Sequence, residues 1–358
     1  MFVHLISAEV GVSPQEQKVR IVGNLLDPVS VRLSEPPDAP PMVIPVSPKR
    51  DLLSPNADRS LDLIPARLLA KSMTQTYSKS FYLATKLLPV HVREDVYAVY
   101  AFCRQSDNIV DAPRQRSLPL ISRELVQWRE ELRAAYMSGE SQHPVLNAFV
   151  DVALRNNIPA YLPEELISGV EMDLSYDRYP TFDALYRFCY RVASVVGLMM
   201  TRIIGTTDAQ AFRHAEELGI GMQLANILRD IHEDWRLRGK IYIPQDEMDH
   251  FGVTEEQIER GTITPQLRDL LAFQVGRAHS YFEKSEQGIS MLTADGQFAV
   301  VAASRLYRGI LYEIERNGYD VFARRPVVST YRKVSKEAGV VRAVIERTCV
   351  SVGSRRSS

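Results

Sequence analysis

Long runs of helical periodicity constrain the fold of this chain more than any other feature. From Leu61 onward, apolar residues recur with the helical period over long stretches, and alternating strand patterns are almost absent. Turn signals separate the stretches, as at Leu88-Pro89 and Arg238-Gly239. The pattern predicts helices over residues 65–78, 80–87, 90–110, 118–138, 143–156, 163–175, 182–204, 208–236, 244–251, 254–260, 265–293 and 295–317. We therefore expect an all-α fold, a single multi-helix domain around a central apolar cavity.

Three segments are expected along the chain. Residues 1–60 are rich in proline and lack a sustained apolar period, which predicts a flexible Pro-rich N-terminal extension. The helical domain is expected over 61–335, where no linker composition interrupts the pattern. Residues 336–358 end in Arg355-Arg356 followed by two serines and are expected to form a frayed tail.

Composition excludes several classes of protein. The 43 basic and 44 acidic residues give a formal net charge of -1, so no polycation for nucleic acid is implied. The spacings of Cys103, Cys189 and Cys349 match neither a zinc site nor a disulfide framework, which favours buried free thiols and a reducing compartment. There is no apolar run long enough for a transmembrane helix, and the first residues make a poor secretory signal.

A stretch of acids and amides near the middle of the chain is the first candidate site. Asp230 and Asp234 lie one turn apart on one helix face, and Gln223 and Asn226 continue that stripe. The adjoining face is apolar, so these side chains could face an interior cavity, where a divalent metal would offset the repulsion between the acids. A solvated acidic face, balanced by neighbouring arginines, is an equally good interpretation of this stretch alone.

A second acidic pair, about 120 residues earlier, favours the metal-binding interpretation over the solvated face. Asp107 and Asp111 are again four residues apart on an apolar helix, with Arg104 before them as Arg229 precedes Asp230. Two such helices favour binding of a diphosphate through bridging Mg²⁺, or Mn²⁺ in its place, because Mg²⁺ commonly joins carboxylates to substrate phosphates. Arginines add hydrogen bonds to the same oxygens, and an apolar cavity would hold a hydrocarbon tail.

With these motifs the chain resembles the squalene and phytoene synthase family of head-to-head prenyl transferases. The resemblance runs from about Lys71 to Arg332 and rests on Tyr77-Ser-Lys-Ser-Phe81, the acidic stretch from Arg104 to Asp111, MDLSYDRY, YRFCYRVASVVGLM, and NILRDIHED followed by GKIYIPQDE. It implies an isoprenoid (terpenoid) synthase fold for residues 61–335.

The resemblance also implies roles for individual residues. The metal ligands would be Asp107, Asp111, Asn226, Asp230 and Asp234. Arg104 and Arg229 would act with these acids at the diphosphates, and the substrate-binding positions would be Tyr77, Ser78, Lys79, Ser80, Tyr100, Gln223, Tyr307 and Arg324. The match is looser at Tyr100, Tyr307 and Arg324, and the two tyrosines could instead be ordinary core aromatics. Asn108 stands where many members carry an acid, which puts the number of metal contacts in doubt.

The implied reaction joins two prenyl diphosphates head to head. The stretches AVYAFCR, MDLSYDRY and FCYRVASVVGLM look more like those of phytoene synthases, which implies condensation of two geranylgeranyl diphosphates through prephytoene diphosphate to phytoene. The alternatives are a C30 synthase, making presqualene diphosphate, dehydrosqualene or squalene from farnesyl diphosphate, and a non-catalytic helical assembly subunit. A downstream desaturase is the candidate protein partner.

Tail length and location are the least constrained expectations. Val96 lies about 16 Å below Asp107 on the same helix face, and its side chain and that of Thr85 leave room for a long tail, whereas Tyr97 would shorten the tunnel if it pointed inward. Since both substrate and product partition into lipid, we expect a cytoplasmic protein that is transiently peripheral to a membrane.

Overall fold

The computed structural model describes residues 63–323, apart from 79–80, 83–84, 87 and 112–116. Within these residues the regular structure is helical, and β-structure is limited to two isolated bridges, Arg178 with Ile241 and Thr206 with Leu292. The expected all-α class is confirmed. The first helices are α3 (Ile64–Tyr77), α5 (Val90–Asp111), α6 (Leu118–Ser138), α7 (Pro144–Arg155) and α8 (Tyr161–Ser175). They are followed by α9 (Phe182–Cys189), the π-helical turn η1 (Tyr190–Ser194), α10 (Val195–Ile204), α11 (Ala211–Arg238), α12 (Gln245–Phe251), α13 (Glu255–Arg260), α14 (Pro265–Glu286), the 3₁₀ turn η2 (Ile289–Met291) and α15 (Ala294–Arg316).

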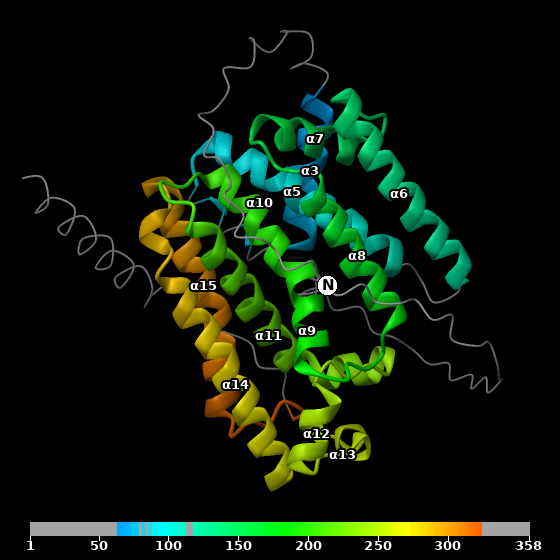
Figure 1. Ribbon diagram of the computed structural model, residues 1–358, viewed down its shortest axis with the longest axis vertical. Helices are drawn as coiled ribbons and strands as arrows, with labels where there is room; N and C mark the ends of the chain where they lie inside the picture. Colours follow the sequence, from blue (N-terminus) through cyan, green and yellow to red (C-terminus); the bar gives the residue numbers. More distant parts are fainter. Residues whose placement is uncertain (1–62, 79–80, 83–84, 87, 112–116, 324–358) are drawn as a thin grey trace, which may run out of the picture.

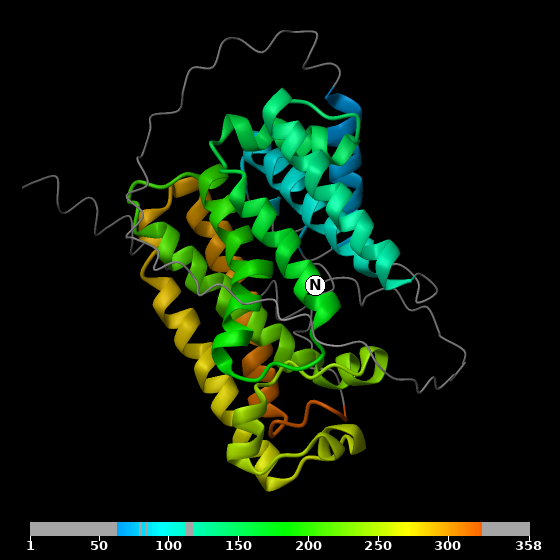
Figure 2. The ribbon, with the colours of Figure 1, turned by 45° about the vertical axis from the view of Figure 1, so that its right-hand side comes forward.

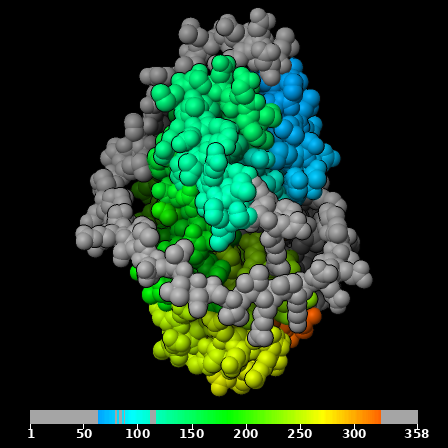
Figure 3. All heavy atoms as spheres, turned by 90° about the vertical axis from the view of Figure 1, so that its right-hand side faces the viewer, coloured from blue at the N-terminus to red at the C-terminus, as the bar shows by residue number. Residues whose placement is uncertain are grey.

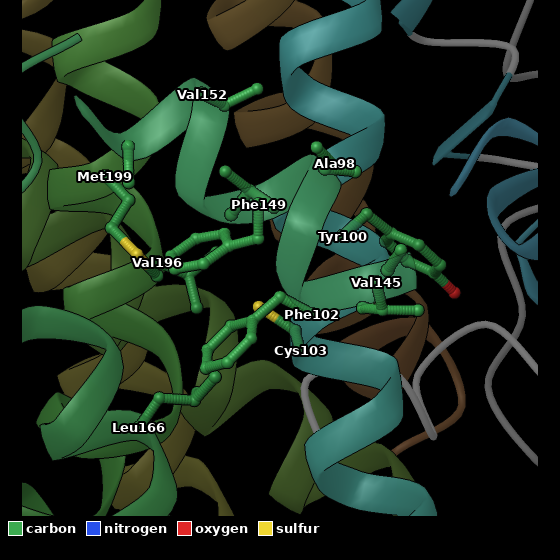
Figure 4. Packing of buried hydrophobic residues seen from close by; sticks show 14 of the residues in the cluster. Ala98, Tyr100, Phe102, Cys103, Val145, Phe149, Val152, Leu166, Val196 and Met199 are labelled. Carbon is green, nitrogen blue, oxygen red and sulfur yellow. The ribbon is translucent and has the colours of Figure 1, made fainter. Parts of the chain in front are cut away.

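The early helices pack around one apolar core. Its centre is Phe102 of α5, which stacks on Phe149 of α7 with ring centroids 4.3 Å apart and on Trp128 of α6 at 5.9 Å. Figure 4 shows the rings of Phe102 and Phe149 together with Leu166 and Met199, while the ring of Tyr100 lies apart from them, with its hydroxyl pointing away. Tyr100 belongs to the same buried cluster, but its hydroxyl is directed away from these rings.

The later helices form a second core around α11. Helices α14 and α15 run alongside α11, and α9 and α10 cover another side of it (Figures 1 and 2). In the space-filling view, α3 (blue) and α6 (blue-green) lie toward one end of the molecule and the yellow helices toward the other (Figure 3). Helix α11 packs against α14 and α15 in the second core and also against α10, whose Val195, Val196 and Met199 belong to the first core.

Helix α11 is surrounded by protein along its middle. Every residue from Gly219 to Arg229 is buried, as expected for a helix that is covered on all sides. A Cβ atom at Gly219 would lie 2.5 Å from Cα of Ser194, so only glycine lets α11 rest directly on η1. This contact fixes α11 against the continuous helix formed by α9, η1 and α10. Gln223, Asn226 and Arg229 lie in the buried stretch of α11 and therefore face the interior.

Two predicted helices differ from the structure. The segment 182–204 is helical as expected but contains the π turn η1. The helix predicted over 265–293 is wrong at its end, because α14 stops at Glu286 and the chain passes through η2 before α15. A Cβ at Gly288 would lie 2.3 Å from Cβ of His214, so this segment approaches α11 more closely than a regular helix bearing side chains could.

Other expectations fall partly or wholly outside the described residues. Cys103 and Cys189 are buried free thiols, and burial raises the pKa of both, whereas Cys349 lies outside the described residues. The N-terminal extension over 1–60, the domain limit at 335 and the tail over 336–358 lie outside them as well and stay predictions. Among the described helices, none is both long and apolar enough to cross a membrane.

Candidate active site

Helix α5 brings Arg104 and Asp107 to the inner end of the first core. Both side chains are buried, with 8% and 6% of their surface exposed. The guanidinium of Arg104 lies over the ring of Tyr77, 4.5 Å from its centroid, which fixes the end of α3 against α5. The next residue, Ser78, is fully buried and its hydroxyl accepts a hydrogen bond from the amide of Phe81 at 3.1 Å. The predicted residues Tyr77 and Ser78 therefore lie beside the first acidic motif.

Tyr100 and Tyr307 extend this group toward α11. Tyr100 stacks on Phe81 with centroids 5.2 Å apart, and burial raises the pKa of its phenol, with Arg104 acting in the opposite direction. Burial also raises the pKa of Tyr307 to about 12, against the influence of Arg229. Tyr307 lies within electrostatic range of both Tyr100 and Arg229, so α5, α11 and α15 meet here. Both phenols remain protonated at neutral pH.

Helix α11 presents the second acidic motif as a preorganised ion pair. Arg229 donates from Nε and Nη2 to the two carboxylate oxygens of Asp230, at 2.9 and 2.5 Å. Burial and, next, the charge of Asp230 raise the pKa of Asp234 to about 7, although Arg238 acts in the opposite direction. An additional positive charge between Asp230 and Asp234 would relieve this repulsion.

Several buried polar atoms of the site have no hydrogen-bond partner among the described residues. They are both side-chain heteroatoms of Asn226, Oε1 of Gln223 and the hydroxyl of Tyr100, and all three side chains are 2% exposed. Leaving such atoms unsatisfied costs roughly 1–3 kcal/mol each, so buried polar groups normally have partners. Their concentration on α5 and α11 indicates that the site receives polar atoms from a ligand.

The donor set fits a hard divalent cation shared with a substrate. Asn226, Asp230 and Asp234 offer oxygens along one face of α11, and Asp107 offers another from α5. Within the described residues, no group of three or more His, Cys, Asp or Glu side chains is arranged to hold a metal by itself. Mg²⁺ typically combines one or two carboxylates with substrate phosphates and water, so a ready-made protein cage is not needed.

An apolar cavity continues from this site along α11. It contains about 1050 Å³ of space between atoms, including the part open to solvent. Phe81, Met222 and Tyr307 line the end near the acids, and helices α10, α11 and α15 supply much of the wall. At the far end the cavity is lined by Ile204, Ala211, His214, Gly288, Ile289 and Leu292. The expected apolar cavity is therefore present, and its wall at Met222 and Tyr307 lies next to the polar residues of the site.

The residues predicted to flank the tunnel near α5 can be compared with the residues that line the cavity. Thr85 and Val96 line the cavity as expected. Tyr97 lies outside the described lining, and its hydroxyl is 3.3 Å from Oγ1 of Thr85. Since Tyr97 does not point inward, it does not shorten the tunnel.

A buried charge cluster beside Asp234 was missed by the sequence reasoning. Asp173 of α8 accepts hydrogen bonds from Arg238 at 3.0 Å, from Lys240 at 3.1 Å and from the hydroxyl of Tyr242 at 2.5 Å. Lys240 also donates to the backbone carbonyl of Asp173. The cluster ties the end of α8 to the segment after α11. These residues stood within the motifs MDLSYDRY and GKIYIPQDE, but the motifs alone did not say which side chains pair.

The structure brings together most, but not all, of the predicted site residues. Asp107, Arg104, Tyr77, Ser78 and Tyr100 lie on the α3–α5 side, and Gln223, Asn226, Arg229, Asp230, Asp234 and Tyr307 lie on the α11–α15 side. Lys79, Ser80, Arg324 and the side chain of Asp111 lie outside the described residues. His232, which had no predicted role, packs edge-on against Phe322 with centroids 5.6 Å apart.

Many helices around an apolar cavity, with acids on two of them at its mouth, define an isoprenoid synthase fold. A solved dehydrosqualene synthase in complex with a ligand has the same fold, with a TM-score of 0.73 and 29% sequence identity over 81% of this chain and 100% of that one. The sequence model of the squalene/phytoene synthase family matches residues 74–332. This chain therefore belongs to the squalene/phytoene synthase family.

Two curated relatives are similar over most of their length. A phytoene synthase from Arthrospira platensis is 40% identical over 279 residues, which cover 74% of this chain and 89% of that protein. A 15-cis-phytoene synthase from Synechococcus elongatus is 37% identical over 316 residues, 85% of this chain and 99% of that protein. Both relatives are enzymes, which argues against a non-catalytic assembly subunit.

Proposed function

We propose that this chain is a phytoene synthase, which joins two molecules of geranylgeranyl diphosphate head to head, through prephytoene diphosphate, into the C40 hydrocarbon phytoene. The relatives named phytoene synthase, at 37% and 40% identity, support the reaction type. The observation that carries the proposal is the set of partnerless buried atoms on Gln223, Asn226 and Tyr100 at the mouth of an apolar cavity. Such a site offers polar contacts to a diphosphate and apolar contacts to its hydrocarbon tail.

The residues of the chain bind and orient the diphosphates. Arg104 and Arg229 provide planar guanidinium groups, which suit phosphate oxygens better than a lysine would. Because Asp230 holds Arg229 through two hydrogen bonds, this guanidinium is positioned before substrate arrives. The hydroxyls of Tyr100 and Tyr307 are available as hydrogen-bond donors, since burial keeps both protonated.

We infer that the metal is Mg²⁺, with Mn²⁺ able to replace it. Asp107, Asp111, Asn226, Asp230 and Asp234 would hold it. When bound, such an ion supplies positive charge to the departing diphosphate. Because burial and the charge of Asp230 raise the pKa of Asp234 to about 7, metal binding near neutral pH is expected to release a proton from this carboxyl group.

The reaction proceeds by two ionisations. In the first, the carbon–oxygen bond of one diphosphate breaks, the double bond of the second molecule attacks the allylic cation, and loss of a proton closes a cyclopropane. In the second, the remaining carbon–oxygen bond breaks, the ring rearranges, and loss of another proton gives the hydrocarbon. The apolar wall of the cavity protects both cations from water.

Product mass tests the proposal directly. The purified protein is incubated with Mg²⁺ and either geranylgeranyl or farnesyl diphosphate, and the hydrocarbon is weighed by mass spectrometry. A C40 product from the C20 substrate is expected. If the protein makes a C30 hydrocarbon from farnesyl diphosphate and no hydrocarbon from geranylgeranyl diphosphate, the assignment is contradicted. The C30 alternative, which is the chemistry in the name of the solved dehydrosqualene synthase, is then favoured.

Loss of one carboxylate from either acidic motif is expected to slow turnover strongly. Asp107→Ala and Asp230→Ala each remove a predicted metal ligand, so the rate is expected to fall by about a hundredfold or more. Asp249→Asn, on the exposed surface of α12, is the matched control and keeps full activity. Full activity in both alanine variants would overturn the metal assignment.

We also propose that the protein is cytoplasmic and binds membranes peripherally, delivering its product to a downstream desaturase. The supporting argument is that both tail and product partition into lipid. Flotation with anionic and neutral liposomes measures the binding. If the protein stays in the dense fraction with liposomes of both kinds, peripheral membrane binding is excluded.

A further inference from the structure

The depth of the cavity can be compared with the length of a prenyl tail. Helix α11 runs beside the cavity, and Ala211, His214, Ala215, Leu218 and Met222 line it in succession. Asn226, one turn beyond Met222, is the innermost of the predicted metal ligands and marks the level at which the tail begins. At 1.5 Å per residue, Ala215 lies about 16 Å and Ala211 about 22 Å from that level.

The ends of an extended C15 tail and an extended C20 tail lie on opposite sides of Ala215. A carbon–carbon bond of about 1.5 Å advances an extended chain by about 1.3 Å. The main chain of a C15 tail is then about 14 Å long and that of a C20 tail about 19 Å. An extended C15 tail therefore ends before Ala215, whereas a C20 tail passes it and ends before Ala211.

The wall at this level is built from small groups. Ala215 faces Gly197 of α10, which also lines the cavity, and a Cβ at Gly197 would lie 2.8 Å from the carbonyl oxygen of Ala215. Because two neighbouring helices contribute one methyl group between them here, the cavity stays open for the last part of a long tail.

The end of the cavity beyond Ala215 is held by contacts between α15 and the end of α10. Thr206 pairs with Leu292, and the hydroxyl of Thr293 donates to the carbonyl of Ile204 at 2.6 Å. A Cβ at Gly296 would lie 1.8 Å from a methyl carbon of Ile204, so α15 and the end of α10 are in close contact. This end cannot retreat easily to admit a longer tail.

We propose that Ala215 is a specificity-determining residue that admits the last isoprene unit of a C20 tail, an inference that rests on the proposed function. A larger side chain at this position projects into the cavity, and since helical side chains lean toward the N-terminus of their helix, it fills the space just beyond the end of a C15 tail. It blocks the C20 tail and leaves room for the C15 tail.

The test is product selection by Ala215→Leu in a mixture of geranylgeranyl and farnesyl diphosphates. The ratio of C40 to C30 hydrocarbon is expected to fall by about tenfold or more, since lost room for a few carbons in a pocket changes selectivity by about 10–200-fold. Ala211→Leu, which lines the cavity beyond the end of the C20 tail, is expected to change the ratio by less than about threefold. Ala209→Leu is a control at an exposed position just before α11 and is expected to leave the ratio of C40 to C30 hydrocarbon unchanged.

The outcomes separate this inference from the proposed function. If the wild-type protein makes no C40 hydrocarbon, the proposed function fails. If it does and folded Ala215→Leu keeps the wild-type ratio, or if Ala211→Leu shifts it as strongly, Ala215 does not set the tail length. Ala215→Ser is the second variant, because it is nearly isosteric and is expected to keep both folding and the wild-type ratio.

Discussion

At the scale of single residues, ionisation of Asp234 is costly for the folded protein. Asp234 carries a pKa of about 7 because it is desolvated and lies beside Asp230, so its ionised form is disfavoured in the folded state. A carboxyl whose pKa is raised on folding favours the folded state at low pH, and that contribution is lost as pH rises from the unfolded value near 3.8 through 7. The acid is retained at a cost in stability, which a cation would offset.

Removing this carboxylate is expected to stabilise the metal-free protein. At pH 8, Asp234→Asn should raise the free energy of unfolding by about 1–2 kcal/mol, a value reduced from the full shift because the side chain is partly exposed. Toward pH 5 the gain shrinks, since wild-type Asp234 is then protonated when folded. Urea unfolding at both pH values, with Asp249→Asn as the control, measures the effect. A gain that is independent of pH would show that Asp234 is not the cause.

At the scale of elements, the contact of α11 with η1 positions the site. Gly219 is the point of contact, and four and seven residues later come Gln223 and Asn226. A Cβ at Gly219 meets the backbone of Ser194 and Ala193, which cannot rotate away as a side-chain end could. The register of α11, which carries the acids, against the cavity wall therefore depends on the absence of a Cβ atom at Gly219.

Gly219→Ala is expected to destabilise the protein by about 2 kcal/mol or more, because it overpacks two backbones. Gly276→Ala, in the exposed face of α14 where no atom lies within 4 Å of the added carbon, is expected to stabilise by about 0.5–1 kcal/mol. Chemical denaturation of both variants gives the comparison. Equal stabilities would mean that the α11–η1 contact yields without cost.

Helical periodicity and motif spacing predicted most of these elements, and they identified both acidic helices. They could not reveal η1, because the chain is buried almost continuously from Val192 to Met199, and a shift of one residue cannot be recognised in so continuous an apolar stretch. Nor could they pair Asp173 with Lys240 and Tyr242, since such contacts depend on how α8 meets the end of α11. The break at Gly288 was missed because its cause lies on another helix, at His214.

At the scale of the whole molecule, the site lies between two cores. Asp107 extends from the helix at the centre of the first core, and Asp230 and Asp234 extend from the helix at the centre of the second. A ligand that contacts both helices adds a connection between two separately packed halves. The stability of the molecule is therefore linked to occupancy of the site.

Inorganic diphosphate and Mg²⁺ together are expected to raise the melting temperature more than the sum of their separate effects. A combined ligand at a hundred times its Kd adds about 2.7 kcal/mol to the free energy of unfolding. Differential scanning calorimetry of wild type and Asp107→Ala measures the shift, which the variant should largely lose. Additive shifts would indicate that metal and diphosphate bind at independent places.

The π turn η1 carries a further consequence. A π turn accommodates one more residue per hydrogen-bonded ring than an α turn does. Deleting a single residue between Tyr190 and Ser194 would convert it into ordinary α-helix, and because the wide turn had absorbed that residue, the helix on either side would keep its orientation. Val196, Gly197 and Met200 would then stay in the cavity wall. The wide turn therefore allows the length of this helix to differ by one residue without displacing the side chains that form the tunnel.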